Sequence, residues 1–112
     1  MATRKLDKSA WKAYFDAISR HLGSRLSEIE VASLDLGDQV EAEWIPLQGI
    51  TYDPKDDLIE VVMEEIDHMI RNPVEIYVEE GMEGLHSVEV VDADGSRQII
   101  RLKAPLALPE AV

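Results

Sequence analysis

The sequence predicts an α+β fold that is mostly β. In this fold an N-terminal amphipathic helix packs on a small, strongly bent antiparallel sheet, or on an Sm/SH3-like barrel, of five to six strands. Hydrophobic residues recur at helical spacing over residues 7–22, and the period changes to two after Gly23. Turn residues then divide the chain into short segments. With 112 residues, 46% of them hydrophobic, residues 1–112 suit a single domain.

Residues 7–22 carry the pattern of one amphipathic helix. Asp7 or Ser9 can cap its start, and Gly23 suits a left-handed C-terminal stop. The stripe is too hydrophobic to stay in water, so we expect it to dock on the sheet. Its members are Trp11, Tyr14, Phe15, Ile18 and Leu22.

The β part is expected over about residues 26–103, beginning with a strand in which Ile29 and Val31 alternate with glutamates. A strand end and a turn are expected over 34–38. A second strand runs from Val40 to Tyr52, and Pro46 within it indicates an edge or a bulge.

Four features organise the rest of the chain. Residues 53–57 form a proline turn before a strand over 58–63, and residues 64–72 fit either a helix or a strand. A short strand covers 74–78. Residues 85–91 and 96–102 form a hairpin around Asp94-Gly95, and 104–112 make an extended, loosely held tail.

The charge is high and unevenly placed. The 23 acidic and 11 basic side chains give a net charge of −12. Residues 1–25 hold six basic and two acidic side chains, so the remainder is strongly acidic. Such a body argues against nucleic acid as a partner, because that affinity rests largely on Lys and Arg contacts. The basic segment is either held against the acidic body or offered to an anionic partner.

The composition also excludes some chemistry. Without cysteine, disulfides, thiolate metal sites and cysteine nucleophiles are excluded. No hydrophobic run approaches the roughly 20 residues of a membrane-spanning helix, and no secretory signal is visible. We therefore expect a cytoplasmic protein that has no membrane association and no cofactor.

Potential metal ligands are poorly spaced. Residues 92–95 resemble the opening of a calcium loop, but the twelfth position is Lys103, where a glutamate is needed, so an ordinary turn is expected. His68 has acidic neighbours and stays a candidate for binding a ligand or a cation, while no specific metal site is predicted. The sequence also lacks a phosphate-binding glycine loop and a nucleophile elbow, and no carboxylate pair stands out for acid–base catalysis.

The turn after Tyr52 resembles the loop of Sm-like barrels, in which an Asp and an Asn hold a uridine base. Asp53 matches the aspartate of that family, and Asp57 stands where the asparagine is expected. The second Sm motif, an Arg-Gly pair, is absent from the late hairpin turn at Asp94-Gly95. The resemblance implies a barrel and names Asp53 and Asp57 as candidate ligand-binding residues.

A second resemblance covers nearly the whole chain. Residues 2–6, 28–39 and 49–57, together with Asp67-His68, Ile70-Arg71, Pro73 and the segment 75–78, resemble DUF5335, an uncharacterised family of short bacterial proteins. The resemblance implies a stand-alone bacterial protein and brings no activity or ligand.

Three functions follow as hypotheses. The first is a non-catalytic interaction or self-assembling module that forms a homo-oligomer through strand edges or the helix. The second is an Sm-like binder of nucleic acid or nucleotides near Asp53 and Asp57. The third is a small-molecule or cation site in the acidic segment around His68.

Overall fold

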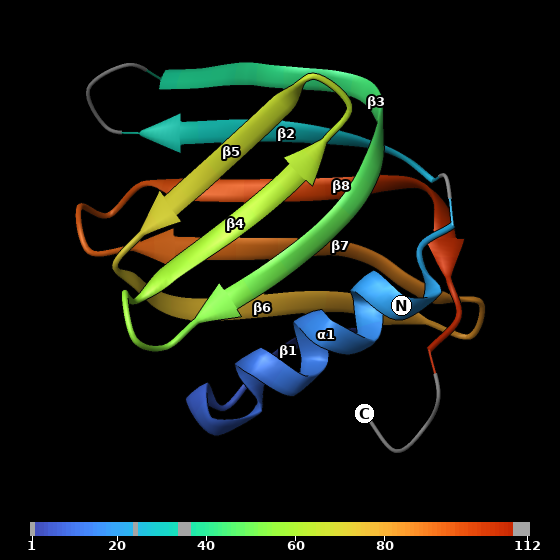
Figure 1. The fold of residues 1–112 in the computed structure, drawn as a ribbon, viewed down its shortest axis with the longest axis horizontal. Coiled ribbons are helices and arrows are strands. Elements are labelled where there is room, and N and C mark those ends of the chain that lie inside the picture. Colours follow the sequence, from blue (N-terminus) through green and yellow to red (C-terminus); the bar gives the residue numbers. More distant parts are fainter. Residues whose placement is uncertain (1, 24, 34–36, 109–112) are drawn as a thin grey trace.

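The computed structural model describes residues 2–23, 25–33 and 37–108, and these form mostly antiparallel β structure with one short α-helix (Figure 1). The strand order within the sheet is β1-β6-β7-β8-β2-β3-β4-β5. The elements are β1 (Ala2–Lys5), the 3₁₀ helix η1 (Lys8–Ala10), α1 (Trp11–His21), β2 (Leu26–Ser33), β3 (Gly37–Asp53), β4 (Leu58–Met63), β5 (Ile66–Arg71), β6 (Pro73–Gly81), β7 (Gly84–Asp92) and β8 (Arg97–Leu106).

The predicted class, mostly β and antiparallel with one helix, is confirmed, but the predicted strand number is wrong. The described residues form a sheet of eight strands instead of five to six. One additional strand is β1, so the helix does not open the chain. Another is β5 (Ile66–Arg71), which makes the central part of the ambiguous segment 64–72 a strand. The pairings of the described residues give a sheet with two ends, β1 and β5.

The bend in β3 folds this sheet over itself. The first half of β3 pairs with β2 as far as Pro46, and the second half pairs with β4 from Leu47 onward. A register shift between Leu47 and Gly49 accompanies the change of partner, as the bulge expected at Pro46 requires. As a result, the second half of β3 crosses over β6, β7 and β8 together with β4 and β5 (Figure 1).

The core lies between these layers and is closed by α1. Hydrophobic side chains of both layers meet there, among them Ile50, Ile59, Val61, Ile70, Ile76, Val78, Val88, Val90 and Ile100. The helix contributes Trp11, Phe15 and Ile18, which are almost completely buried. Gly23 ends the helical segment with a φ of +61°, the left-handed stop that the sequence predicted.

The C-terminal segment is more ordered than predicted. β8 extends to Leu106, and the side chain of this residue is buried in the core. The expected loose tail is therefore wrong for residues 104–106. The expected turn over 34–38 and the end of the tail at 109–112 fall largely or wholly outside the described residues.

The part of the chain that the structure describes includes no helix with the length and hydrophobicity needed to cross a membrane.

Candidate assembly edge

The two aspartates predicted to bind a ligand instead stabilise the proline turn. Asp53 accepts a hydrogen bond from the Lys55 backbone N–H at 2.9 Å. Asp57 accepts one from the Tyr52 hydroxyl at 2.8 Å and has a φ of +50°. Burial, followed by this hydrogen bond, raises the pKa of Tyr52 to about 12. Both carboxylates thus have local structural partners.

An open hollow of about 540 Å³ lies beside this turn and is lined by Lys8, Lys12, Tyr52 and Asp57, among other residues. Lys12 is in an ion pair with Asp16 at 3.0 Å, and the Lys8 ammonium lies 5.5 Å from the Trp11 ring centroid. These lysines therefore already have partners within their own helical segment.

His68 lies on β5 and connects the two layers of the fold. Its Nε2 donates a hydrogen bond to Oε1 of Gln98 on β8. The Gln98 amide donates to Asp92 at 3.1 Å, and the other oxygen of Asp92 accepts the backbone N–H groups of Asp94 and Ser96. Asp92 therefore holds the turn that the sequence compared with a calcium loop. Within residues 2–23, 25–33 and 37–108 there is no group of three potential metal ligands.

The structure does not bring the three predicted site residues together. Asp53 and Asp57 lie at the turn between β3 and β4, whereas His68 is paired with Val61 in the middle of β4. The predicted ligand residues thus belong to two separate places. Asp53 and Asp57 form hydrogen bonds within a turn, and His68 forms a hydrogen bond between the two layers.

β5 has different chemistry on its two faces. Ile66, His68 and Ile70 point inward, and Ile70 is fully buried. Asp67, Met69 and Arg71 alternate with them and are exposed. Met69, a large hydrophobic side chain, is 44% exposed. The outer face of β5 therefore presents an acid, a thioether and a base in a row.

The charges in this row have no oppositely charged partner among the described residues. Asp67 contacts Glu60 of β4, and the pKa of Glu60 is raised by the hydrogen bond and the repulsion between these two carboxyl groups. The Arg71 guanidinium donates a hydrogen bond to the Met69 sulfur at 3.9 Å. A surplus of negative charge at Asp67 and a cation at Arg71 thus lie toward opposite ends of this row, and no carboxylate of the described residues pairs with the cation.

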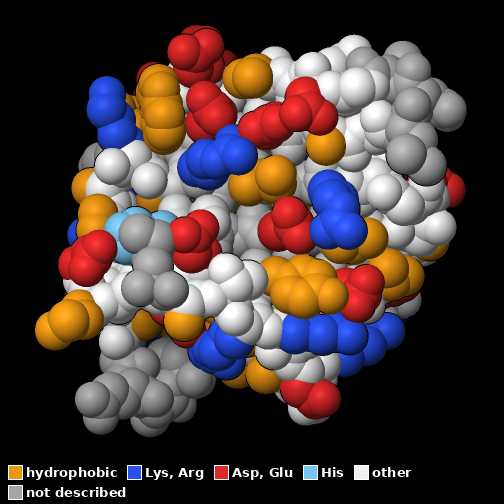
Figure 2. Space-filling model, turned by 180° about the vertical axis from the view of Figure 1, so that it is seen from behind, with side chains coloured by type: hydrophobic (Ala, Val, Ile, Leu, Met, Phe, Trp, Pro, Cys, Tyr) orange, Lys and Arg blue, Asp and Glu red, His pale blue; other side chains and the backbone are white. Residues whose placement is uncertain are grey.

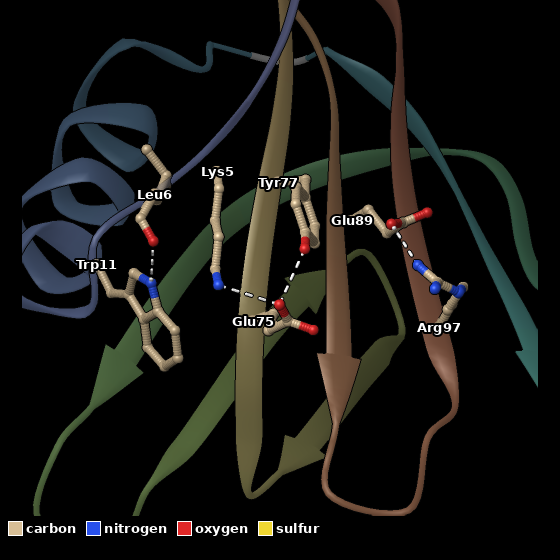
Figure 3. A network of polar contacts seen from close by, with 7 residues as sticks. All are labelled: Lys5, Leu6, Trp11, Glu75, Tyr77, Glu89 and Arg97. Atoms are coloured by element: carbon tan, nitrogen blue, oxygen red, sulfur yellow. Dashed lines mark hydrogen bonds and ion pairs between the residues drawn. The ribbon is translucent and has the colours of Figure 1, made fainter.

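The opposite side of the molecule differs from β5. On the outer face of the layer formed by β1, β6, β7 and β8, oppositely charged side chains form pairs. Lys5 contacts Glu75 at 3.1 Å, the Tyr77 hydroxyl donates to the same carboxylate, and Arg97 contacts Glu89 at 2.9 Å (Figure 3). Basic and acidic side chains alternate over this face (Figure 2).

The basic N-terminal segment takes part in this pairing. Besides the contact between Lys5 and Glu75, Arg4 contacts Glu80 at 2.7 Å, and Glu80 also accepts a hydrogen bond from the Tyr14 hydroxyl. The ion pair with Arg4 lowers the pKa of Glu80. Arg4 and Lys5 are therefore paired with acidic side chains of β6, whereas Lys8 and Lys12 have partners within their own helical segment.

The other sheet edges are protected. β1 has four residues and carries Arg4 and Lys5. The first half of β3 has register shifts against β2 and a left-handed Trp44, with a φ of +52°. The second half of β3 is covered by α1, where the Ser19 hydroxyl accepts a hydrogen bond from the Ile50 N–H at 3.0 Å and donates one to the Ile50 carbonyl at 2.7 Å. Short length, charge, bulges and a covering helix are recognised protections against edge-to-edge pairing.

β5 lacks several of these protections, although Asp67 and Arg71 place charges on its outer face. It is six residues long, contains no proline and no lysine, and pairs with β4 without a register shift. Every second residue of an antiparallel edge strand directs its N–H and C=O groups away from its neighbour, so β5 presents backbone groups that no other described strand pairs with. This edge, Ile66–Arg71, is the candidate assembly edge.

Comparison with known proteins places the chain in a family. The family model described as "Family of unknown function (DUF5335)" matches residues 2–111. The chain belongs to this family. A relative from Aquifex aeolicus (strain VF5), an uncharacterised protein, is 46% identical over 111 residues, and the match covers 98% of this chain and all of that protein. No solved structure gives a significant match.

For this DUF5335 protein, sequence reasoning missed the residues that define the candidate assembly edge. Asp67 and Arg71 are four apart, a spacing that suits one face of a helix as well as one face of a strand. In the structure, a two-residue turn at Glu64-Glu65 connects β4 to β5 and makes residues 66–71 a strand. Glu65 adopts a φ of +66° in this turn, a conformation more usual for glycine, so the sequence carries no turn signal there. Once the strand is known, the row of acid, thioether and base can be read from the sequence.

Proposed function

We propose that this protein is a non-catalytic module that assembles with copies of itself through the candidate assembly edge. The single observation that supports the proposal is the chemistry of β5, a regular edge strand with free backbone groups and charges without opposite partners. Strand addition at an open edge is a common mode of protein association, because backbone hydrogen bonds supply affinity and side chains supply register.

The helix, the other predicted surface for self-association, is a weaker candidate than β5. Its hydrophobic face is buried in the core of its own chain, so it offers little surface to a second molecule. The Sm-like and cation-binding alternatives also have weaker support, because Asp53, Asp57 and His68 are engaged in local hydrogen bonds. The open edge of β5 favours self-association over both.

Self-association predicts a mass that depends on concentration. The mass of one chain is 12.6 kDa. The molar mass that light scattering measures across a size-exclusion peak should rise from this value toward twice this value as the protein concentration increases through the micromolar range. Backbone amides of β5 should exchange with deuterium more slowly at the high concentration, since pairing protects them. A constant mass of 12.6 kDa at every concentration contradicts the proposal.

A further inference from the structure

We infer that two copies of this chain pair β5 against β5, antiparallel, about a two-fold axis through Met69. The inference rests on the proposed self-association and specifies its register. In this arrangement Met69 lies opposite the partner's Met69, and Asp67 lies opposite the partner's Arg71. The symmetry repeats the second contact with the chains exchanged, as an isologous interface requires.

The arrangement is self-complementary in charge. Residues directly opposite each other on one face of an antiparallel pair interact, and opposite charges there are favourable while like charges are unfavourable. Each Asp67 receives a guanidinium and each Arg71 receives a carboxylate, so both charges without opposite partners are matched at once. The repulsion between Glu60 and Asp67 is also relieved, because a cation then lies beside them.

Neighbouring registers lack this match. A shift of one residue brings the buried Ile70 to the outer face of the joined sheet, since side chains alternate with a period of two. A shift of two residues in either direction keeps the outer faces of the two strands aligned. It places Asp67 opposite the partner's Met69 in one direction and opposite the partner's Pro73 in the other. A parallel, in-register pair sets Asp67 against Asp67 and Arg71 against Arg71. The register centred on Met69 therefore satisfies the most charges.

The edge itself suits a second copy geometrically. Its outer face is exposed, and the hydrophobic side chain at the proposed axis is 44% exposed in the single chain. Pairing joins β3, β4 and β5 of one molecule to the same strands of the other, which gives one continuous sheet across the axis. The two β5 edges protect each other, so the assembly closes as a dimer and does not extend into a fibre.

Charge reversal tests the register through complementation. Asp67→Arg places two arginines opposite each other at both symmetric positions, and Arg71→Asp places two aspartates there. Each single variant should raise the dissociation constant of the dimer by about tenfold or more, since two favourable pairs become two unfavourable ones. The D67R/R71D double variant should dimerise like the native chain.

An equimolar mixture of the two single variants gives the sharpest result. A chain with two arginines in the row matches a chain with two aspartates, so the mixture should form a heterodimer at concentrations where each variant alone is a monomer. Native mass spectrometry separates the heterodimer from both homodimers. Lys55→Asp and Asp56→Arg make the same charge changes at the exposed turn outside β5, and they should leave the dissociation constant unchanged.

The outcomes separate the register from the proposed function. If the native chain dimerises and every variant dimerises equally well, assembly occurs through another surface, and the Met69-centred register is overturned while self-association stands. If the single variants weaken the dimer and the mixture does not restore it, the pairing of Asp67 with the partner's Arg71 is overturned. If the native chain is monomeric throughout, both proposals fail.

Discussion

Replacing Trp11 with alanine should lower the free energy of unfolding by about 3–5 kcal/mol, the range for a large aromatic side chain removed from a core. Trp11 is 1% exposed and meets the Tyr52 ring edge-on, with 5.2 Å between the ring centroids. The substitution leaves a cavity between α1 and the bent half of β3. Most single domains have about 5–15 kcal/mol of stability in total, so the loss is large.

The same change removes a polar contact near the start of the helix. The Trp11 indole donates a hydrogen bond to the Leu6 carbonyl at 3.3 Å (Figure 3), and the Leu6 N–H in turn donates to the Ile76 carbonyl of β6. Chemical denaturation at a fixed protein concentration measures the effect. The matched control is Lys12→Ala, an exposed neighbour on the same helix, which should change stability by no more than about 0.5 kcal/mol. A loss below about 1 kcal/mol for W11A would contradict the burial of Trp11 between α1 and β3.

Replacing Gly84 with alanine should cost about 3 kcal/mol or more, because overpacking against a backbone and a strained dihedral angle each cost roughly 1–3 kcal/mol. Gly84 has a φ of +122°, and a Cβ atom there would lie 2.2 Å from the Leu106 carbonyl oxygen and 2.8 Å from the Ala107 nitrogen. Backbone atoms cannot yield as a flexible side chain can, so β7 and the end of β8 must separate.

Gly95 provides the matched control for this prediction. It also has a positive φ, +84°, but a Cβ atom there meets nothing within 4 Å. Gly95→Ala therefore keeps the dihedral strain and omits the steric clash. Thermal unfolding of the two variants should place the midpoint of G84A well below that of G95A. Equal midpoints would show that Leu106 does not pack on Gly84.

Features with strong local signals were predictable. The helix follows from hydrophobic spacing between Trp11 and Ile18, and the late hairpin follows from Asp94-Gly95 between two alternating segments. The bend in β3 follows from Pro46 and Gly49. In each case neighbouring residues alone determine the conformation.

Features that depend on distant partners were not predictable. β1 has four exposed residues and no hydrophobic period, and it forms a strand because it pairs with β6 and because Arg4 and Lys5 meet glutamates there. Pro105 suggested a loose tail, yet Leu106 is held in the core beside Gly84. Such contacts arise from the folded chain and leave no local pattern in the sequence.

The residues of the candidate site also differ in how well the sequence alone indicates their roles. Asp53 and Asp57 were conspicuous because they flank a proline turn, and stabilising that turn is the use that the structure makes of them. Asp67 and Arg71 were inconspicuous because their spacing fits a helix and a strand equally well. Their relation to a second molecule depends on β5 being the last strand of the sheet, which is a property of the whole topology.

The dimer axis at Met69 can be tested most directly with a single introduced thiol. The chain contains no cysteine, so Met69→Cys carries one thiol per molecule. Directly opposite residues of an antiparallel pair have Cα atoms about 4.5–5.5 Å apart, a separation that a disulfide can bridge. Met82→Cys, at a fully exposed turn position, is the matched control.

Mild oxidation followed by non-reducing electrophoresis should convert M69C to a covalent dimer at protein concentrations where M82C stays monomeric. Added native chain should slow the formation of the covalent M69C dimer, because it pairs with M69C chains and carries no thiol. Added M69R should not slow it, because a charge at the axis prevents this pairing. If M69C links no faster than M82C, the two-fold pairing of β5 is contradicted.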